Sequence, residues 1–117
     1  MEIHMITKAG RINDRFAWFK KPEHLVENRR LQVTTAPKTD LWQGTYYDFR
    51  RDTGHCLMAE VKQDFSLIVR TEFFPRPQYD HCGLIVRANT GNWIKASTEY
   101  EVNGSSRIGS VVTNLGW

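Results

Sequence analysis

Residues 79–100, YDHCGLIVRANTGNWIKASTEY, constrain the fold of this chain more than any other segment. Two runs rich in β-branched and apolar residues, 83–88 and 93–100, flank a short Asn-Thr-Gly-Asn connection. Connections of this composition and length reverse the chain between antiparallel strands. The segment therefore predicts a β-hairpin with two long strands, and a sheet to which that hairpin belongs.

Side chains alternate between the two sides of a strand, so the predicted hairpin has two faces. If Arg87 lies opposite Trp93, one face is apolar and is predicted to be core; it comprises Leu84, Val86, Ile94 and Ala96. The opposite face combines an aromatic ring, two cations, an imidazole and a carboxylate, from His81, Arg87, Trp93, Lys95 and Glu99. That mixture suits a polar ligand and also suits a solvated surface.

Strand signals continue along most of the remaining sequence. Alternating or β-branched runs bounded by turn residues predict further strands at 16–19, 31–35, 41–47, 55–61, 65–74 and 108–113. Tight turns are expected at 27–30, 62–64 and 103–106, with a loop at 50–54. No window keeps apolar residues at helical spacing. The prediction is an all-β protein, an antiparallel β-sandwich. Residues 1–117 are expected to form a single domain, of which residues 1–15 are a polar leader.

Composition places the chain with ordinary globular proteins, at 117 residues, 40% hydrophobic and 25% charged. It has no apolar run of the roughly 18 residues that a membrane span needs, and no signal-peptide pattern. We therefore expect a cytoplasmic protein that does not bind membranes, with Cys56 and Cys82 as free thiols. The net charge of +3 arises in the first thirty residues, where the basic residues are scattered, so nucleic-acid binding is not expected.

Four strings of the sequence carry a family resemblance: WFKKPEH (18–24), LQVTTAPKTDLW (31–42), RDTGHCL (51–57) and the hairpin segment 79–100. They resemble the domain-of-unknown-function 1349 family, which is also called regulation-of-enolase-1-like. The four strings follow one another along the chain in the order found in that family. The resemblance spans about residues 16–117, and the Asn-Trp-Ile-Lys-Ala string at 92–96 with Tyr100 is its most specific part. It implies a concanavalin A-like lectin/glucanase jelly roll.

Members of that family usually extend well beyond the position at which this chain ends, Trp117. The resemblance therefore implies a jelly roll that lacks several strands. An incomplete sandwich would expose unpaired strand edges and the apolar inner face of a sheet to water. A symmetric partner can cover the same surface on both copies, so we expect a homodimer, in one version with strands exchanged between protomers.

Concanavalin-like folds often bind sugars on a concave sheet, with aromatic rings stacked on pyranose faces and charged groups on hydroxyls. The candidate ligand-binding residues of matching types are Trp42, His55, Tyr79, His81, Arg87, Trp93, Lys95 and Glu99. Each has a structural alternative. Trp42 and Trp93 suit packing in a core or at its rim, and the charged residues suit cross-strand ion pairs.

The sequence favours a binding module without catalytic residues, for a carbohydrate or a protein partner. The alternative is a glycan hydrolase that uses Glu99, because retaining glycosidases need two carboxyl groups about 5 Å apart and Glu101 lies two residues away on the same strand face. The Glu-x-Asp-x-x-Glu pattern of concanavalin-fold glucanases does not occur in the sequence. No metal site is expected, since Asp80 and His81 are adjacent in a strand and point to opposite faces. No cofactor is expected either.

Overall fold

The computed structural model describes residues 2–43, 50–74, 80–101 and 103–114 of the chain. Within these ranges the regular secondary structure consists of β-strands, and the strand pairings β1–β6, β2–β3, β7–β8 and β8–β9 are antiparallel. The prediction of an all-β, antiparallel fold is confirmed. The described ranges contain no helix that could cross a membrane. The chain forms two compact units, residues 1–41 with 50–65 and residues 42–49 with 66–117.

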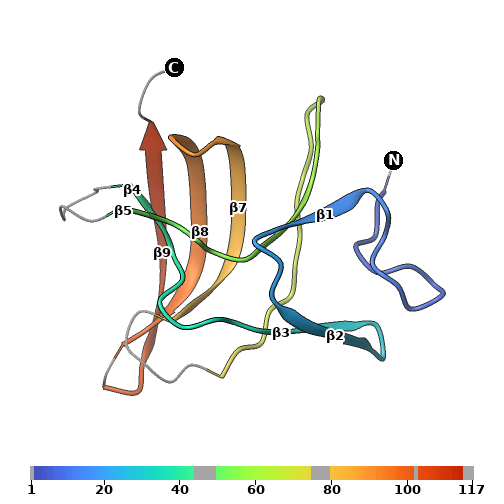
Figure 1. Ribbon diagram of the computed structural model, residues 1–117, viewed down its shortest axis with the longest axis horizontal. Coiled ribbons are helices and arrows are strands. Elements are labelled where there is room, and N and C mark those ends of the chain that lie inside the picture. Colours follow the sequence, from blue (N-terminus) through green and yellow to red (C-terminus); the bar gives the residue numbers. More distant parts are fainter. Residues whose placement is uncertain (1, 44–49, 75–79, 102, 115–117) are drawn as a thin grey trace. The chain divides into compact units, whose positions relative to one another are not determined.

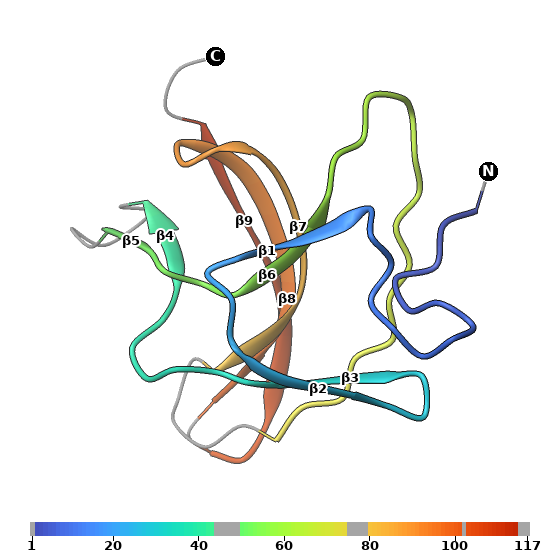
Figure 2. The ribbon, with the colours of Figure 1, turned by 45° about the vertical axis from the view of Figure 1, so that its right-hand side comes forward.

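The first unit contains two strand pairs that the sequence indicates only in part. β1 (Phe16–Phe19) pairs with β6 (Cys56–Ala59), and β2 (Glu23–Glu27) pairs with β3 (Arg30–Thr34), as Figures 1 and 2 show. β2 is not among the strands predicted from the sequence. Pro22 immediately precedes β2, where its missing N–H removes no ladder hydrogen bond.

The turn between β2 and β3 confirms the one predicted at 27–30. Its two central residues, Asn28 and Arg29, both adopt positive φ angles, of 51° and 59°. A two-residue turn of this kind matches the right-handed twist of the strands that it joins. The register Glu27 opposite Arg30 follows directly from it.

The polar leader also has local structure. An antiparallel bridge joins Ile6 to Ile12, and the backbone N–H of Asn13 donates to the carbonyl of Met5 at 2.7 Å. Gly10 turns the chain between them with a φ of 78°, a value that glycine adopts without steric cost. The leader is therefore a small hairpin-like loop.

A short two-stranded sheet, β4 (Leu41–Gln43) with β5 (Arg50–Asp52), differs from the predicted strand 41–47 and loop 50–54. The rest of the predicted strand, 44–47, lies outside the described residues. Leu41 is among the few buried hydrophobic residues, and a Cβ added to Gly54 would lie 2.7 Å from its Cγ. Because Gly54 has no side chain, its own backbone can lie close to the side chain of Leu41.

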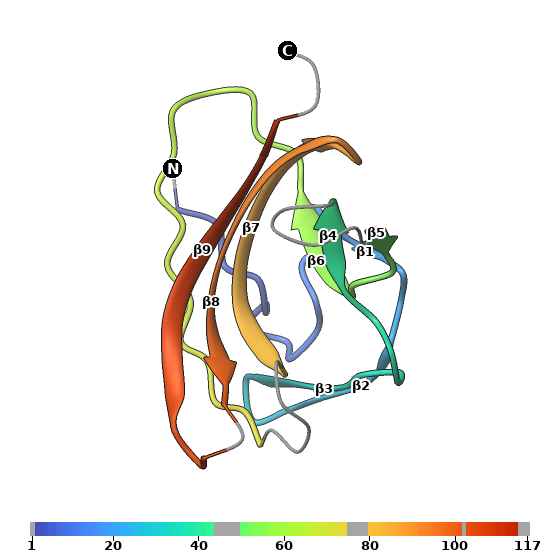
Figure 3. The same ribbon diagram turned by 90° about the vertical axis from the view of Figure 1, so that its left-hand side faces the viewer.

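The second unit contains the longest strands of the chain. β7 (His81–Asn89), β8 (Asn92–Tyr100) and β9 (Ser106–Asn114) form a sheet in the order β7-β8-β9, and Figure 3 shows that the three strands bend together. The predicted hairpin is confirmed, including Arg87 opposite Trp93. Its connection is stabilised by the Asn89 side chain, whose Oδ1 accepts from Gly91 N at 3.0 Å. The two cysteines of the chain, Cys82 in β7 and Cys56 in β6, form no disulfide.

The prediction of which hairpin face forms the core is wrong. Val86 and Ile94 on the predicted core face are 49% and 51% exposed, whereas Trp93 and Lys95 on the opposite face are 3% and 7% exposed. Alternation distinguishes two faces but does not say which one other groups cover. The large indole and the aliphatic stem of the lysine contribute as much apolar area to burial as the aliphatic side chains would.

The predicted strand at 65–74 is also wrong, because residues 65–74 pair with no strand among the described residues. Most of its apolar side chains are exposed, namely Phe65, Leu67, Ile68, Val69 and Phe74. Apolar alternation makes a segment suitable for a sheet, but strand formation also needs a neighbouring backbone to accept its hydrogen bonds. The predicted strand 55–61 is correspondingly shortened to Cys56–Ala59.

Candidate functional site

One face of the three-stranded sheet brings together five of the eight candidate residues. Cross-strand register places His81 opposite Glu99 and Arg87 opposite Trp93, and residues directly opposite in an antiparallel pair point to the same side. Lys95 lies between Trp93 and Glu99 on the same side of β8. We call this surface the mixed face; it comprises His81, Arg87, Trp93, Lys95 and Glu99.

Lys95 occupies the middle of the mixed face and is buried. Its Nζ lies 3.3 Å from His81 Nε2 and 5.7 Å from the centroid of the Trp93 ring. An ammonium group has only hydrogens to donate, so His81 Nε2 is the acceptor and the ring proton resides on Nδ1. The indole face adds a cation–π attraction. This arrangement positions a lysine nitrogen between an imidazole and an indole.

Trp93 is fixed by both packing and a hydrogen bond. Its Nε1 donates to the carbonyl of Thr90 at 3.0 Å, and the side chain is almost fully buried. Trp93 is therefore a packed side chain, which is the structural alternative to a ligand-binding role. The ring has little free surface on which a sugar could stack.

Arg87 and Glu99 are more accessible than Trp93 and flank the buried centre of the mixed face. A guanidinium nitrogen of Arg87 donates to Thr90 Oγ1 at 3.1 Å, which connects this arginine to the β7–β8 turn. Glu99 is half-buried and lies between His81 on β7 and Arg107 on β9 in the register. The sheet thus presents a guanidinium near one end and a carboxylate near the other.

The other three candidate residues do not belong to β7, β8 or β9. His55 belongs to the first unit, where its Nε2 accepts from Ala36 N at 3.1 Å and its Nδ1 bonds the carbonyl of Lys20. These two bonds fix one tautomer and give the imidazole a structural role between loops. Trp42 lies in β4, but its side chain lies outside the described part, as does the whole of Tyr79.

Two buried polar residues of the sheet were not predicted as site residues. Thr113 lies directly opposite Trp93 on β9, and its Oγ1 is buried without a hydrogen-bond partner among the described residues. Asn92 Oδ1, at the start of β8, is likewise buried and has no partner in the described part of the chain. A buried polar atom without a partner costs about 1–3 kcal/mol, so such atoms are rare and call for a partner. Only the β8–β9 register could have indicated Thr113.

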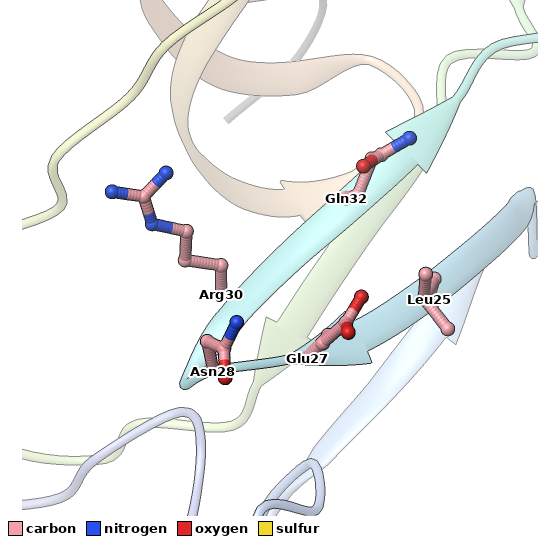
Figure 4. A pocket seen from close by; sticks show the side chains of 5 residues that line it. All are labelled: Leu25, Glu27, Asn28, Arg30 and Gln32. Carbon is pink, nitrogen blue, oxygen red and sulfur yellow. The ribbon is translucent and has the colours of Figure 1, made fainter.

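A separate shallow depression lies on the β2–β3 hairpin (Figure 4). It is lined by Leu25, Glu27, Asn28, Arg30 and Gln32, and its volume is about 130 Å³. Pockets for small molecules usually measure about 300–1,000 Å³. This depression is therefore too small to enclose a sugar. Among the described residues, no three His, Cys, Asp or Glu side chains are grouped as metal ligands would be.

Comparisons with known proteins identify the family. Residues 18–117 match the model of a family described as "Protein of unknown function (DUF1349)". The chain is 36% identical over 98 residues to "Regulation of enolase protein 1" of Saccharomyces cerevisiae, an alignment that covers 83% of this chain and 49% of the yeast protein. The chain thus spans about half the length of this relative. No solved structure matches the chain. The family match covers most of the sequence, and the chain belongs to the DUF1349 family.

Proposed function

We propose that this chain is a non-catalytic binding module that contacts its ligand with the mixed face and Thr113. The observation that carries the proposal is the buried hydroxyl of Thr113, which has no hydrogen-bond partner among the described residues and lies opposite Trp93 in the register. A ligand group that bonds this hydroxyl would recover the free energy that its burial costs, and it can reach the hydroxyl only when the groups that cover it move aside. Arg87, His81 and Glu99 would then bond the more accessible parts of the ligand.

A protein partner fits this surface better than a pyranose ring does. Sugar recognition relies on an exposed aromatic face, whereas Trp93 is buried. Half-buried charged groups beside a buried aromatic are common at protein interfaces, where charged groups determine specificity. A carbohydrate remains the second candidate, because hydroxyl groups can bond a guanidinium, an imidazole and a carboxylate without stacking.

Thr113→Val provides a direct test, because it removes the hydroxyl and keeps the shape of the side chain. We expect the free chain to become more stable by about 1 kcal/mol and its affinity for the ligand to fall about fivefold or more. Thr98→Val is the matched control, since Thr98 lies on the opposite face of β8 and should change neither quantity by as much. Undiminished binding by Thr113→Val would place the ligand elsewhere.

Two ligand sources should be tested in parallel. The printed name of the yeast relative concerns regulation of enolase, so purified enolase is the first protein to test by titration calorimetry, with Arg87→Ala as the variant that should weaken binding. A glycan array tests the carbohydrate version.

Trp93→Ala is a poor probe of the site, because truncating a buried tryptophan costs about 3–5 kcal/mol of stability.

Catalysis is an outcome that the same variants can reveal. Glu101, the second carboxylate considered for a hydrolase, begins the β8–β9 turn, where its N–H donates to Ser105 O at 2.9 Å. A non-catalytic module should not turn over aryl glycosides. Turnover that Glu99→Gln abolishes would replace the binding proposal with a hydrolase. We also infer a cytoplasmic location, supported by the lack of a disulfide between Cys56 and Cys82.

A further inference from the structure

The sheet of the second unit exposes a largely apolar surface opposite the mixed face, interrupted by the hydroxyl groups of Thr98 and Ser110. The register places Leu84 and Val86 of β7, Ile94 and Ala96 of β8, and Ile108 and Val112 of β9 on this side. Most of them are exposed: Ile94 is 51%, Val112 60% and Ile108 89% exposed. We call this surface the apolar face; it comprises Leu84, Val86, Ile94, Ala96, Ile108 and Val112.

An exposed apolar patch of this kind marks an interaction surface in a folded protein. We propose that the apolar face is the interface of a homodimer, in which the β7–β8–β9 sheets of two copies pack face to face. The packing would resemble that of a β-sandwich, in which two sheets lie about 10 Å apart with their apolar side chains interdigitated. The proposal does not depend on the ligand of the mixed face, which lies on the other side of the sheet.

The charge distribution favours a second copy as the occupant. The mixed side of the sheet carries His81, Arg87, Lys95, Glu99 and Arg107, whereas the opposite side carries no Asp, Glu, Lys, Arg or His side chain. An interface on a twofold axis brings each residue close to its own copy or to its neighbours' copies, so like charges there would repel. An uncharged face avoids that repulsion, although the chain has a net charge of +3.

The size of the face sets the expected affinity. Three strands of nine residues make a surface about 30 Å long and about 14 Å wide, roughly 400 Å² per copy. Stable interfaces bury about 800 Å² of accessible surface per partner. We therefore expect a weak dimer.

Sedimentation equilibrium over about 1–200 μM chain tests the proposal. The wild-type chain should shift from monomer to dimer across this range. Ile108→Lys and Ile94→Lys should each raise the dissociation constant at least about tenfold, because each places a cation in the interface of both copies. Ile108 is almost fully exposed in the single chain, so its substitution removes little intramolecular packing even if Ile94→Lys impairs folding.

Leu25→Lys is the matched control. Leu25 lies in β2 of the first unit and is 54% exposed, close to the value for Ile94, so a lysine there adds the same charge at a residue that is not part of the apolar face. It should leave the dissociation constant within about twofold of the wild-type value. A monomeric wild-type chain at the highest concentration would overturn the proposal. Equal weakening by Leu25→Lys, or none by Ile108→Lys, would also overturn it.

Discussion

At the scale of single residues, Gly83 shows how closely β7 and β8 approach. A Cβ added to this glycine would lie 2.2 Å from the carbonyl oxygen of Ala96 and 2.6 Å from Cα of Ser97, both backbone atoms of β8. Backbone cannot rotate away as a side chain can, so the strands would have to separate locally. Position 83 therefore requires glycine for steric reasons.

Gly83→Ala should lower the free energy of unfolding by about 2–3 kcal/mol, the usual cost of forcing atoms into a packed site. Urea denaturation followed by circular dichroism measures this change. Gly109→Ala on β9 is the control, since a Cβ there meets no atom within 4 Å. The control variant should be neutral or slightly stabilised, because alanine restricts the unfolded chain. A similar loss in both variants would contradict the steric explanation.

Cys82 illustrates how burial changes the chemistry of one side chain. Burial raises the pKa of the Cys82 thiol above its ordinary value of 9.0, and a hydrogen bond with the Thr71 side chain lowers it by a smaller amount. Because the thiolate is the reactive form, the folded protein should protect this residue from alkylation.

The raised pKa also predicts a pH dependence of stability. The folded state holds the thiol proton more tightly, so this contribution is complete below pH 9.0 and is lost as the pH rises through the higher pKa of the folded state. The free energy of unfolding should fall between pH 8.5 and 10.5 by less in Cys82→Ser than in the wild type. In the Cys56→Ser variant, Cys82 is the remaining thiol, so alkylation reports on Cys82 alone. The pH midpoint of this alkylation should be higher in the native state than in urea. Identical midpoints would contradict the burial effect.

At the scale of elements, the β2–β3 turn uses a residue poorly suited to its backbone. Arg29 adopts a φ of 59°, and a non-glycine residue in this left-handed region costs about 1 kcal/mol relative to glycine. The preferred sequence for this turn type is Asn-Gly, and the chain has Asn28 in the first position but arginine in the second.

Arg29→Gly should therefore raise the free energy of unfolding by about 1 kcal/mol, as measured by urea denaturation. The neighbouring Arg30→Gly is the control. Arg30 is the first residue of β3, and glycine within a strand is unfavourable, so this variant should lose about 0.5–1 kcal/mol. A stabilised Arg30→Gly, or an unchanged Arg29→Gly, would show that the turn is not the cause.

At the scale of the whole molecule, the prediction of a single domain can be tested by cooperativity. A chain of 117 residues is of a size that usually unfolds in one transition. Urea unfolding should give the same midpoint by circular dichroism and by tryptophan fluorescence. Arg29→Gly lies in the first compact unit and Gly83→Ala in the second, and both should shift that one transition. A biphasic curve in which each variant moves a different phase would show two independently folding units.

The fold class, the longest hairpin and its register follow from short-range patterns in the sequence. A turn-forming connection between β-branched runs predicts the β7–β8 hairpin, and alternation then requires Arg87 and Trp93 to share a face. The same local logic finds the turn at 27–30. The same logic misses β2, which begins directly after Pro22, because a proline that ends one strand and a proline that immediately precedes the next have the same sequence signature.

Antiparallel strands, and the side of each strand on which a given side chain lies, can be read from the sequence, because alternation and turn chemistry act between neighbouring residues. The tertiary structure was needed to show that Trp93 and Lys95 are buried while Ile94 is exposed, and that residues 65–74 pair with no strand among the described residues. Burial and strand pairing depend on groups that are distant in sequence, and a local pattern does not specify which distant group will cover a face or pair with an edge.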